Sequence, residues 1–395
     1  KNEVVSAAFL SEPNRHKRLI DDIYQLIDRY NDKEKPILYC IPVGIKDLFL
    51  VDGFETRAGS RLPASVFIGK ESSLVTRLRD LGALILGKTV STEFAFKHPG
   101  NTRNLYNDNH TPGGSSSGSA VAVALGICPF ALGTQTIGSI IRPAAYCGVF
   151  GFKPSYGQLP IDGVVPFSQS SDHVGFFTQN FDDLKYIASI LLPKKNIALT
   201  QRKEKLTVAL PHNNYLRQAD KDILDFFDRY LQMIDHKHEI VTCDLFEYIE
   251  DINRMHTDLI SYEFAQNHKE WFESHSRLYS RDSTEFIEKG RKVSEEKYAD
   301  AKNFSVLLRA EIEKNVCSKS VDLFITPSTT SFPPKGLEST GSPLMNLPWS
   351  YAGVPALNYP AGFSDSGLPF GIQFTTTFEK DEELIILSES MFVSA

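Results

Sequence analysis

Two glycine- and serine-rich segments that flank an uncharged apolar stretch are the most constraining feature of this 395-residue sequence. The first is Thr-Pro-Gly-Gly-Ser-Ser-Ser-Gly-Ser at 111–119, and the second is Gly-Thr-Gln-Thr-Ile-Gly-Ser at 133–139. From Ala120 to Ile141 there is no charged residue, although glycine, proline and glutamine interrupt the apolar run. The stretch therefore predicts a buried helix, then a buried strand, then a loop, and not a membrane-spanning helix.

Hydrophobic periodicity predicts alternating helices and strands in the rest of the chain. Helices are expected at Pro13–Tyr30, Ser72–Leu81 and Gln218–Asp235, with a charged, mostly helical stretch from Asp251 to Lys319. Strands are expected at Ile37–Val43, Ala83–Leu86, Glu239–Cys243, Val321–Thr326 and Leu368–Phe374. This order predicts one compact α/β domain over residues 1–395, with a largely buried sheet and a helical stretch over it.

Composition excludes several classes of function. The formal net charge of −7 argues against a nucleic-acid partner, which would require a basic surface. Five cysteines, an odd number without a CxxC pair, favour buried free thiols in a reducing compartment, so we expect a cytoplasmic protein. Residues 1–9 lack the pattern of a secretory leader, and no apolar run is long enough to span a membrane.

A metal site is not expected either. The ten histidines show no HExxH or other tight ligand spacing. His236 and His238 flank Lys237 on what the sequence predicts to be a solvated turn, and Phe226 with Phe227 is expected to be helix core.

The two polar loops suggest acyl-transfer chemistry. A flexible linker is the alternative for Gly/Ser-rich sequence, but a linker would not adjoin a buried helix and a second polar loop. Glycines let backbone N–H groups converge on one point, where they stabilise an oxyanion. Thr136, Ile137 and Gly138 are candidates for these donors, and Ser139 is the candidate nucleophile, which needs a base.

These motifs resemble those of the amidase signature family, and the resemblance covers most of the chain. The matching segments are Pro-Val-Gly-Ile-Lys-Asp (42–47), Gly-Lys-Thr (87–89), Glu-Phe-Ala (93–95), the two loops, residues 142–157, Asp172, and the C-terminal segments 353–356 and 367–369. The family fold is a central mixed β-sheet covered by helices on both faces. It implies a core at about 37–180, a more variable helical pocket region at about 192–320, and strands in 321–395 that complete the sheet.

The resemblance implies a Ser–cis-Ser–Lys triad made of Ser139, Ser115 and Lys46, in which the two serines stand 24 positions apart (139 − 115). Neutral Lys46 would accept a proton through Ser115 from Ser139, which attacks an amide carbonyl. A free lysine has a pKa of ~10.4, and burial would lower it. The implied activity is hydrolysis of a small-molecule amide without a cofactor or metal; which amide is left open.

Two positions depart from the family pattern. Many relatives have Asp where this chain has Gln135, and Arg two places after the nucleophile, whereas Arg142 is three places after Ser139. We therefore expect other contacts to replace an Asp–Arg ion pair under the loop. In the variable region, Phe264, Trp271, Phe272 and Tyr279 suggest an apolar or aromatic pocket wall.

Two further segments match known motifs but lack the structural context that those motifs require. Gly82–Thr89 fits the P-loop pattern, but its variable positions are themselves the expected strand. Gly114–Gly118 fits the GxSxG nucleophile elbow around Ser116, but no strand precedes it, and Asp172 and His173 are an improbable source of both triad partners because they are adjacent. A Ser–His–Asp hydrolase is therefore a minor alternative.

Two functions besides stand-alone hydrolysis stay open. One is a degenerate amidase kept as a binding or assembly subunit, although the required residues at all three triad positions argue against it. The other is the amidase-type subunit of an amidotransferase complex, which would use the same triad to make ammonia for a partner. The oligomeric state is open as well. A homodimer is one candidate, because the outer face of the Pro13–Tyr30 helix is free to pair with a second copy.

Overall fold

A single ten-stranded mixed sheet forms the centre of the molecule, in the order β2-β1-β3-β5-β4-β9-β10-β8-β6-β7. The computed structural model describes residues 7–193 and 203–393; residues 1–6, part of the segment considered for a leader, lie outside them. The strands are β1 (Pro42–Lys46), β2 (Leu84–Thr89), β3 (Phe130–Gln135), β4 (Phe150–Lys153), β5 (His173–Thr178), β6 (Thr207–Leu210), β7 (Glu239–Thr242), β8 (Leu323–Pro327), β9 (Ala356–Phe363) and β10 (Pro369–Thr375). β1 pairs parallel with β2 and β3, and β6 pairs parallel with β7 and β8, while the central pairs are antiparallel.

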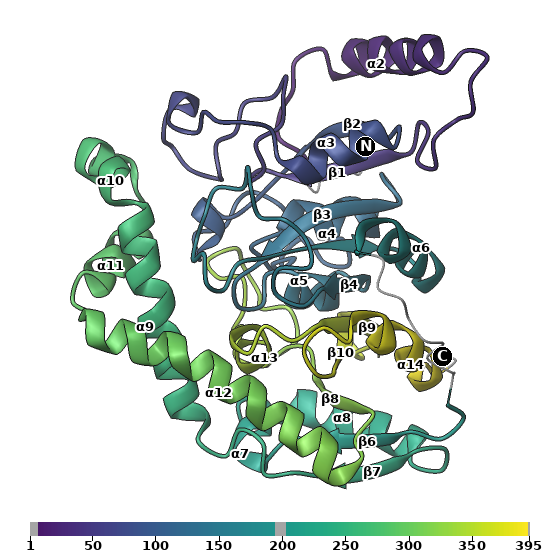
Figure 1. Cartoon of the computed structure of the whole chain (residues 1–395), viewed down its shortest axis with the longest axis vertical. Helices are drawn as coiled ribbons and strands as arrows, with labels where there is room; N and C mark the ends of the chain where they lie inside the picture. The colour runs from purple at the N-terminus through teal and green to yellow at the C-terminus, as the bar shows by residue number, and fades with distance from the viewer. Residues whose placement is uncertain (1–6, 194–202, 394–395) are drawn as a thin grey trace.

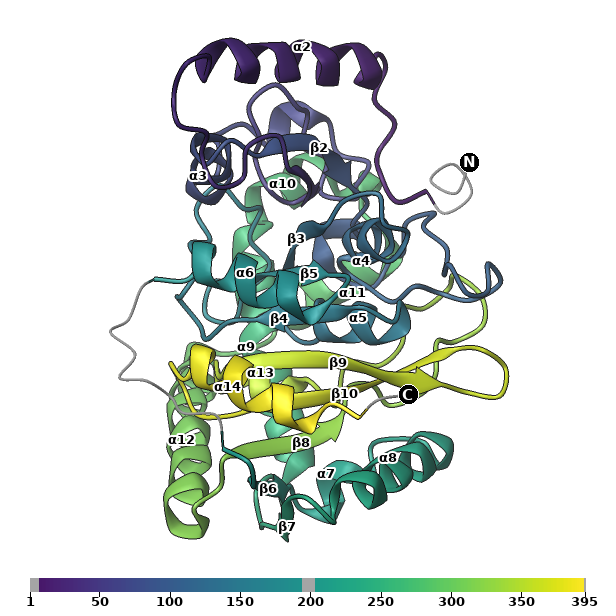
Figure 2. The same cartoon turned by 90° about the vertical axis from the view of Figure 1, so that its right-hand side faces the viewer.

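Helices cover both faces of this sheet, as predicted. Figure 2 shows α6 and α14 in front of the sheet and α9 and α12 behind it, and Figure 1 shows the same two groups on opposite sides. The helices are α2 (Arg15–Arg29), α3 (Ser73–Asp80), α4 (Ser117–Ala124), α5 (Ile141–Tyr146), α6 (Phe181–Leu191), α7 (Asn213–Leu216), α8 (Lys221–Ile234), α9 (Ile249–Asn267), α10 (Lys269–His275), α11 (Arg281–Gly290), α12 (Glu295–Lys319), α13 (Leu347–Tyr351) and α14 (Asp381–Ser388). The predicted α/β class and mixed sheet are confirmed.

The central segment folds as its composition requires. Small residues let α4 lie against the sheet with every residue from Ser117 to Val123 buried. β3 follows as a fully buried strand, and a turn then leads into α5. The predicted order of helix, strand and loop is confirmed. The two polar loops meet because α4 packs along β3, with Ser116 Oγ donating to Thr134 O and Ser119 Oγ to Leu132 O.

The first predicted strand is displaced. Residues 37–40 form turns, and β1 begins only at Pro42 and ends at Lys46. Leu38 N donates to Leu81 O and Cys40 N to Gly82 O, while Cys40 has a φ of 60°, which extended strands do not adopt. The displacement places Lys46 on the sheet, at the end of a buried strand.

The predicted solvated turn at His238 is also wrong. The imidazole is buried, with Nδ1 accepting from Leu206 N and Nε2 lying 3.1 Å from Ser390 O. His236 is exposed, as expected. Phe227 is buried and Phe226 packs against Phe332 and Phe370, which confirms their assignment to the core.

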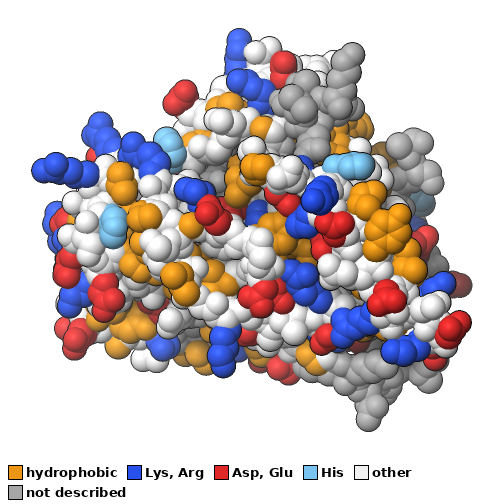
Figure 3. All heavy atoms as spheres, turned by 90° about the horizontal axis from the view of Figure 1, so that it is seen from above, with side chains coloured by type: hydrophobic (Ala, Val, Ile, Leu, Met, Phe, Trp, Pro, Cys, Tyr) orange, Lys and Arg blue, Asp and Glu red, His pale blue; other side chains and the backbone are white. Residues whose placement is uncertain are grey.

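The amphipathic N-terminal helix forms as α2, but it has no fully buried residue. It lies beyond the edge strand β2 in both ribbon views (Figures 1 and 2), and Ile20, Tyr24 and Ile27 remain exposed. On the end of the molecule seen in Figure 3, basic, acidic and apolar side chains are mixed. No helix of the described residues combines the length and apolarity needed to cross a bilayer. Of the cysteines, all unpaired, Cys128, Cys147 and Cys243 are buried, and Cys317 is exposed.

Candidate active site

Lys46 is fully buried at the end of β1, between β2 and β3. Its Nζ donates to Ser115 Oγ at 2.8 Å and to Thr134 Oγ1 at 2.7 Å, with Thr134 O at 3.4 Å. No carboxylate of the described residues forms an ion pair with it. Burial therefore holds the pKa of Lys46 well below its ordinary value, helped by the positive charge of Arg142 and opposed by Asp172. Burial thus shifts the equilibrium of Lys46 toward the neutral amine.

Ser115 lies in the first polar loop, directly after a cis peptide bond that joins it to Gly114. The loop is held from two sides: Ser115 O accepts from Thr92 N at 3.2 Å, and Gly114 O accepts from the Arg142 guanidinium at 2.7 Å. The Ser115 hydroxyl is buried against Lys46. The structure therefore brings these two predicted residues into direct contact.

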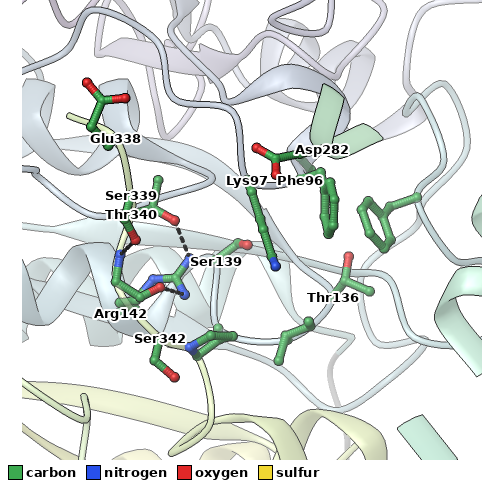
Figure 4. A pocket seen from close by; sticks show the side chains of 16 residues that line it. Phe96, Lys97, Thr136, Ser139, Arg142, Asp282, Glu338, Ser339, Thr340 and Ser342 are labelled. Carbon is green, nitrogen blue, oxygen red and sulfur yellow. Dashed lines mark hydrogen bonds between the residues drawn. The ribbon is translucent and has the colours of Figure 1, made fainter. Parts of the chain in front are cut away.

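Ser139 lies in the turn between β3 and α5 and lines a cavity of about 400 Å³, together with Thr136, Ile137 and Gly138 (Figure 4). Its side chain makes no hydrogen bond to the described residues, whereas its backbone O accepts from Ser116 N at 3.4 Å. The third predicted residue thus faces the cavity and is joined to the Ser115 loop through the backbone. The cavity has the size of an ordinary small-molecule site.

The turn before Ser139 leaves backbone donors unused. The N–H groups of Ile137, Gly138 and Ser139 donate to no acceptor within residues 7–193 and 203–393. Gly138 is required for close packing here, because a Cβ would lie 2.3 Å from Asn346 Oδ1. The turn can therefore offer N–H groups to a ligand in the cavity.

Gln135 supports this turn in place of an Asp–Arg pair. Its Oε1 accepts from Ile140 N at 2.7 Å and Ile141 N at 3.0 Å, and its Nε2 donates to Ser350 Oγ at 2.9 Å. Ser350 in turn donates to Ile137 O at 2.7 Å. Arg142 binds elsewhere, to neutral oxygens, so the replacement expected from the sequence is an amide network.

Gln135→Leu is expected to lower the free energy of unfolding by about 2–4 kcal/mol, because it leaves two buried N–H groups unpaired. Urea unfolding measures the change. Gln232→Leu is the control, since Gln232 is exposed on α8 and should change stability by less than ~0.5 kcal/mol. Equal effects of the two variants would contradict the supporting role of Gln135.

Asp172 lies behind the same turn. Its Oδ1 accepts from Thr136 Oγ1 at 2.6 Å, and its Oδ2 accepts from Phe167 N and Ser168 N at 2.8 and 3.0 Å. Burial raises the pKa of Asp172 to about 6, although these three hydrogen bonds favour the carboxylate. Asp172 therefore connects the turn to the loop that carries Phe167.

The residues of the GxSxG and P-loop matches have structural roles. Ser116 Oγ donates to Thr134 O at 3.1 Å and forms no hydrogen bond with a histidine of the described residues. His173 Nδ1 lies 2.7 Å from Ser171 O and 3.1 Å from Gln135 O, and burial holds its pKa well below the ordinary value. Gly87, Lys88 and Thr89 belong to strand β2, so the P-loop geometry is absent there. Lys88 instead forms a buried ion pair with Asp47 at 2.9 Å.

The expected aromatic wall lies one layer behind the cavity. Phe264, Phe272 and Tyr279 are buried, and they pack with Phe94 in a cluster beside the site. The aromatic side chains that line the cavity are Phe96 and Phe167. The prediction was wrong about the lining, because Phe264 packs against Phe96 and Phe167, which line the cavity, and the residue of α11 that reaches it is Asp282.

Several lining residues were not predicted. Lys97 and Asp282 contribute charge, and the segment 338–343 forms one side of the cavity (Figure 4). This segment, Glu-Ser-Thr-Gly-Ser-Pro, shares the small polar composition of the two predicted loops, and that composition was the available signal. Among the described side chains, no group of three His, Cys, Asp or Glu could hold a metal ion.

Comparison with known proteins agrees with this geometry. A family model described as Amidase matches residues 17–385. A glutamyl-tRNA(Gln) amidotransferase subunit of Halalkalibacterium halodurans is 30% identical over 389 residues, which cover 85% of this chain and 79% of that protein. The crystal structure of an amidase matches with a TM-score of 0.86 and 30% identity, over 97% of this chain and 90% of the other.

A second solved structure shares the fold: the peptide amidase from Stenotrophomonas maltophilia, with a TM-score of 0.77, 24% identity, and coverage of 96% of this chain and 87% of that one. The family model spans nearly the whole described sheet, and the motifs that carry the family resemblance surround the buried Lys46–Ser115 contact. The chain therefore belongs to the amidase signature family.

Proposed function

We propose that this protein hydrolyses a carboxamide bond of a small molecule through an acyl-Ser139 intermediate. The observation that carries the proposal is the fully buried Lys46, which contacts the hydroxyls of Ser115 and Thr134 and no carboxylate of the described residues. A buried lysine without a counterion favours the neutral amine, and a neutral amine next to a hydroxyl is a base.

The proton path follows from this contact. Ser139 Oγ transfers its proton to Ser115 Oγ as Ser115 passes its own to Lys46 Nζ, and Ser139 Oγ attacks the amide carbon. The Ser139–Ser115 bond would form once substrate is bound, since catalytic hydrogen bonds are often long or absent in unliganded enzymes. The same path returns a proton to the departing ammonia or amine, and water then cleaves the acyl ester.

The oxyanion would be stabilised by the turn before Ser139. The N–H groups of Ile137, Gly138 and Ser139 have no acceptor among the described residues, and Thr136 is held by Asp172. Donors that are already oriented need no rearrangement when charge develops on the carbonyl oxygen, so they lower the barrier to attack.

The pH dependence of kcat/KM should report the protonation of Lys46. Protonation removes the base, so kcat/KM should fall as pH decreases through its pKa. Asp172 raises the pKa of Lys46, and Asp172→Asn should therefore move this acid limb to lower pH while lowering kcat through the altered hydrogen bonds. Asp162→Asn, at an exposed carboxylate that binds Ser73, should leave the limb in place. The assignment of Lys46 would be contradicted if Asp172→Asn moved the acid limb to higher pH, or if the acid limb had the same position in both variants.

Labelling with a fluorophosphonate tests the nucleophile without knowledge of the substrate. We expect an adduct at Ser139, located by peptide mass mapping, that forms much more slowly in Lys46→Ala. An adduct at Ser116 that is insensitive to Lys46 would instead support a Ser–His–Asp hydrolase. No adduct at any serine would support a non-catalytic homologue or a partner-dependent subunit.

The second candidate function is the amidase-type subunit of an amidotransferase, and the similarity to glutamyl-tRNA(Gln) amidotransferase subunits favours it. Ammonia release separates the two functions. Release from amides by the purified chain alone supports a stand-alone hydrolase, whereas release only with a partner supports the role in a complex. The unpaired cysteines are consistent with the cytoplasm in either case.

A further inference from the structure

Arg142 is a buried cation without a carboxylate partner among the described residues. The side chain lines the cavity at 5% exposure. Its three hydrogen bonds go to Gly341 O at 2.8 Å, Gly114 O at 2.7 Å and Thr340 Oγ1 at 3.1 Å, all neutral oxygens, and Nε has no acceptor in the described part of the chain. A guanidinium has five N–H donors, so this charge is incompletely satisfied where it is expensive to bury.

Lys97 brings a second cation to the same cavity. Figure 4 shows its ammonium extending toward the middle of the cavity, on the side of Ser139 and Thr136. Lys97 Nζ lies 5.5 Å from the ring centre of Phe96, and no ion pair to Lys97 occurs within residues 7–193 and 203–393. This ammonium is therefore available to a ligand.

The two carboxylates that line the cavity do not neutralise these charges. Asp282 and Glu338 form no ion pair with Lys97 or Arg142; in Figure 4 the Glu338 carboxylate lies at the edge of the view, and the Asp282 carboxylate lies beside the backbone end of Lys97, on the side away from its ammonium. The inner surface beside the cations is apolar and comes from Phe96, Ile137 and Phe167. The cavity thus combines an apolar wall with unpaired positive charge near the candidate nucleophile.

We propose that the substrate is an anionic amide, in which a short chain separates a carboxylate from the scissile carboxamide. The carboxylate binds the Lys97 ammonium in the field of Arg142, and the chain contacts the apolar wall. The chain must be short because Arg142 follows Ser139 by three residues and its guanidinium contacts the carbonyl of Gly114, next to Ser115. This inference rests on the proposed amide hydrolysis and defines its substrate class.

Monoamides of dicarboxylic acids, from oxamate to adipamate, test the inference against the neutral diamides of the same length. At the best length, kcat/KM for the monoamide should exceed that for the diamide by about tenfold or more, as expected for a hydrogen bond to a charged group. High salt should reduce this ratio. A ratio at or below one at every length would overturn the proposal.

Lys97→Met identifies the residue responsible. It should bring the ratio close to one, mainly by raising KM for the monoamide, because the variant keeps the apolar stem and loses the charge. Lys70→Met is the matched control, since Lys70 is exposed and lies outside the cavity; it should keep the wild-type ratio. Equal ratios in the two variants would overturn the assignment.

Protection of Ser139 from fluorophosphonate separates failure of the inference from failure of the proposed function. If neither amide is hydrolysed but Ser139 is labelled, the monoamide should protect at about tenfold lower concentration than the diamide. Equal protection by the monoamide and the diamide would overturn the anionic substrate class but not the proposed amide hydrolysis. If Ser139 is not labelled and no amide is hydrolysed, both proposals are overturned.

Discussion

Ser139→Ala is expected to lower kcat for amide hydrolysis by about 10⁵-fold or more, because it removes the attacking oxygen and leaves no other hydroxyl at that point of the turn. Ammonia release under saturating substrate measures the loss, and intact-mass analysis should show no fluorophosphonate adduct. The fold should be retained, since the Ser139 side chain makes no hydrogen bond to the described residues.

Ser116→Ala is the control for the nucleophile. Ser116 is the other candidate serine, and within the described residues its hydroxyl forms hydrogen bonds only with the backbone of Thr134. We expect kcat to fall less than about tenfold, since no catalytic proton passes through it. If Ser116→Ala is inactive and Ser139→Ala retains activity, the nucleophile has been assigned to the wrong loop.

Lys46→Met is expected to lower kcat by about 10³-fold or more while the protein stays folded. The loss follows from removal of the base, and Lys46→Arg should not restore activity because a guanidinium remains protonated. Stability should be retained or increase, because an apolar side chain of similar size replaces a buried amine without a counterion. Ammonia release and thermal unfolding measure the two effects separately.

Lys153→Met is a matched control, because Lys153 is the other fully buried lysine among the described strands and lies away from the cavity. Its Nζ donates to Val354 O at 2.6 Å and Pro154 O at 3.2 Å, and burial lowers its pKa to about 7. This substitution should destabilise the protein by about 1–3 kcal/mol, because the carbonyls lose their donor, and should change kcat little. If Lys46→Met changed kcat little and Lys153→Met lowered it strongly, a catalytic role for Lys46 would be contradicted.

Periodicity predicted those elements whose burial pattern is local. The helix over 218–235 and the strand over 368–374 appear as α8 and β10 within a few residues, because one face of each is continuously apolar. By contrast, β4, β5, β6 and β9 were not predicted. They are short or contain glycine and proline, and they are extended because neighbouring strands supply their hydrogen bonds.

The candidate site was predictable in residue type but not in surroundings. Lys46, Ser115 and Ser139 were identified from motifs, and the structure places the first two in contact and the third at the cavity. Thr134, the second hydroxyl on Lys46, was missed, because strand periodicity indicates burial and does not identify a hydrogen-bond partner. The cavity lining was predicted from the wrong aromatic residues, since the sequence does not show which rings of one packed aromatic cluster face the cavity.

The sequence by itself determined the α/β class, the loop–helix–strand–loop unit and the residues that carry the family motifs, because each depends on short-range pattern. Only the tertiary structure decided that Lys46 has no counterion among the described residues, that Gln135 and Arg142 support different parts of the loops, and that Lys97 faces the cavity. These properties depend on burial and on partners far apart in the sequence, such as Arg142 and Gly341, 199 positions apart, and Gln135 and Ser350, 215 positions apart. These electrostatic effects arise only in the folded interior, where the low dielectric constant strengthens the interaction between neighbouring charges and dipoles.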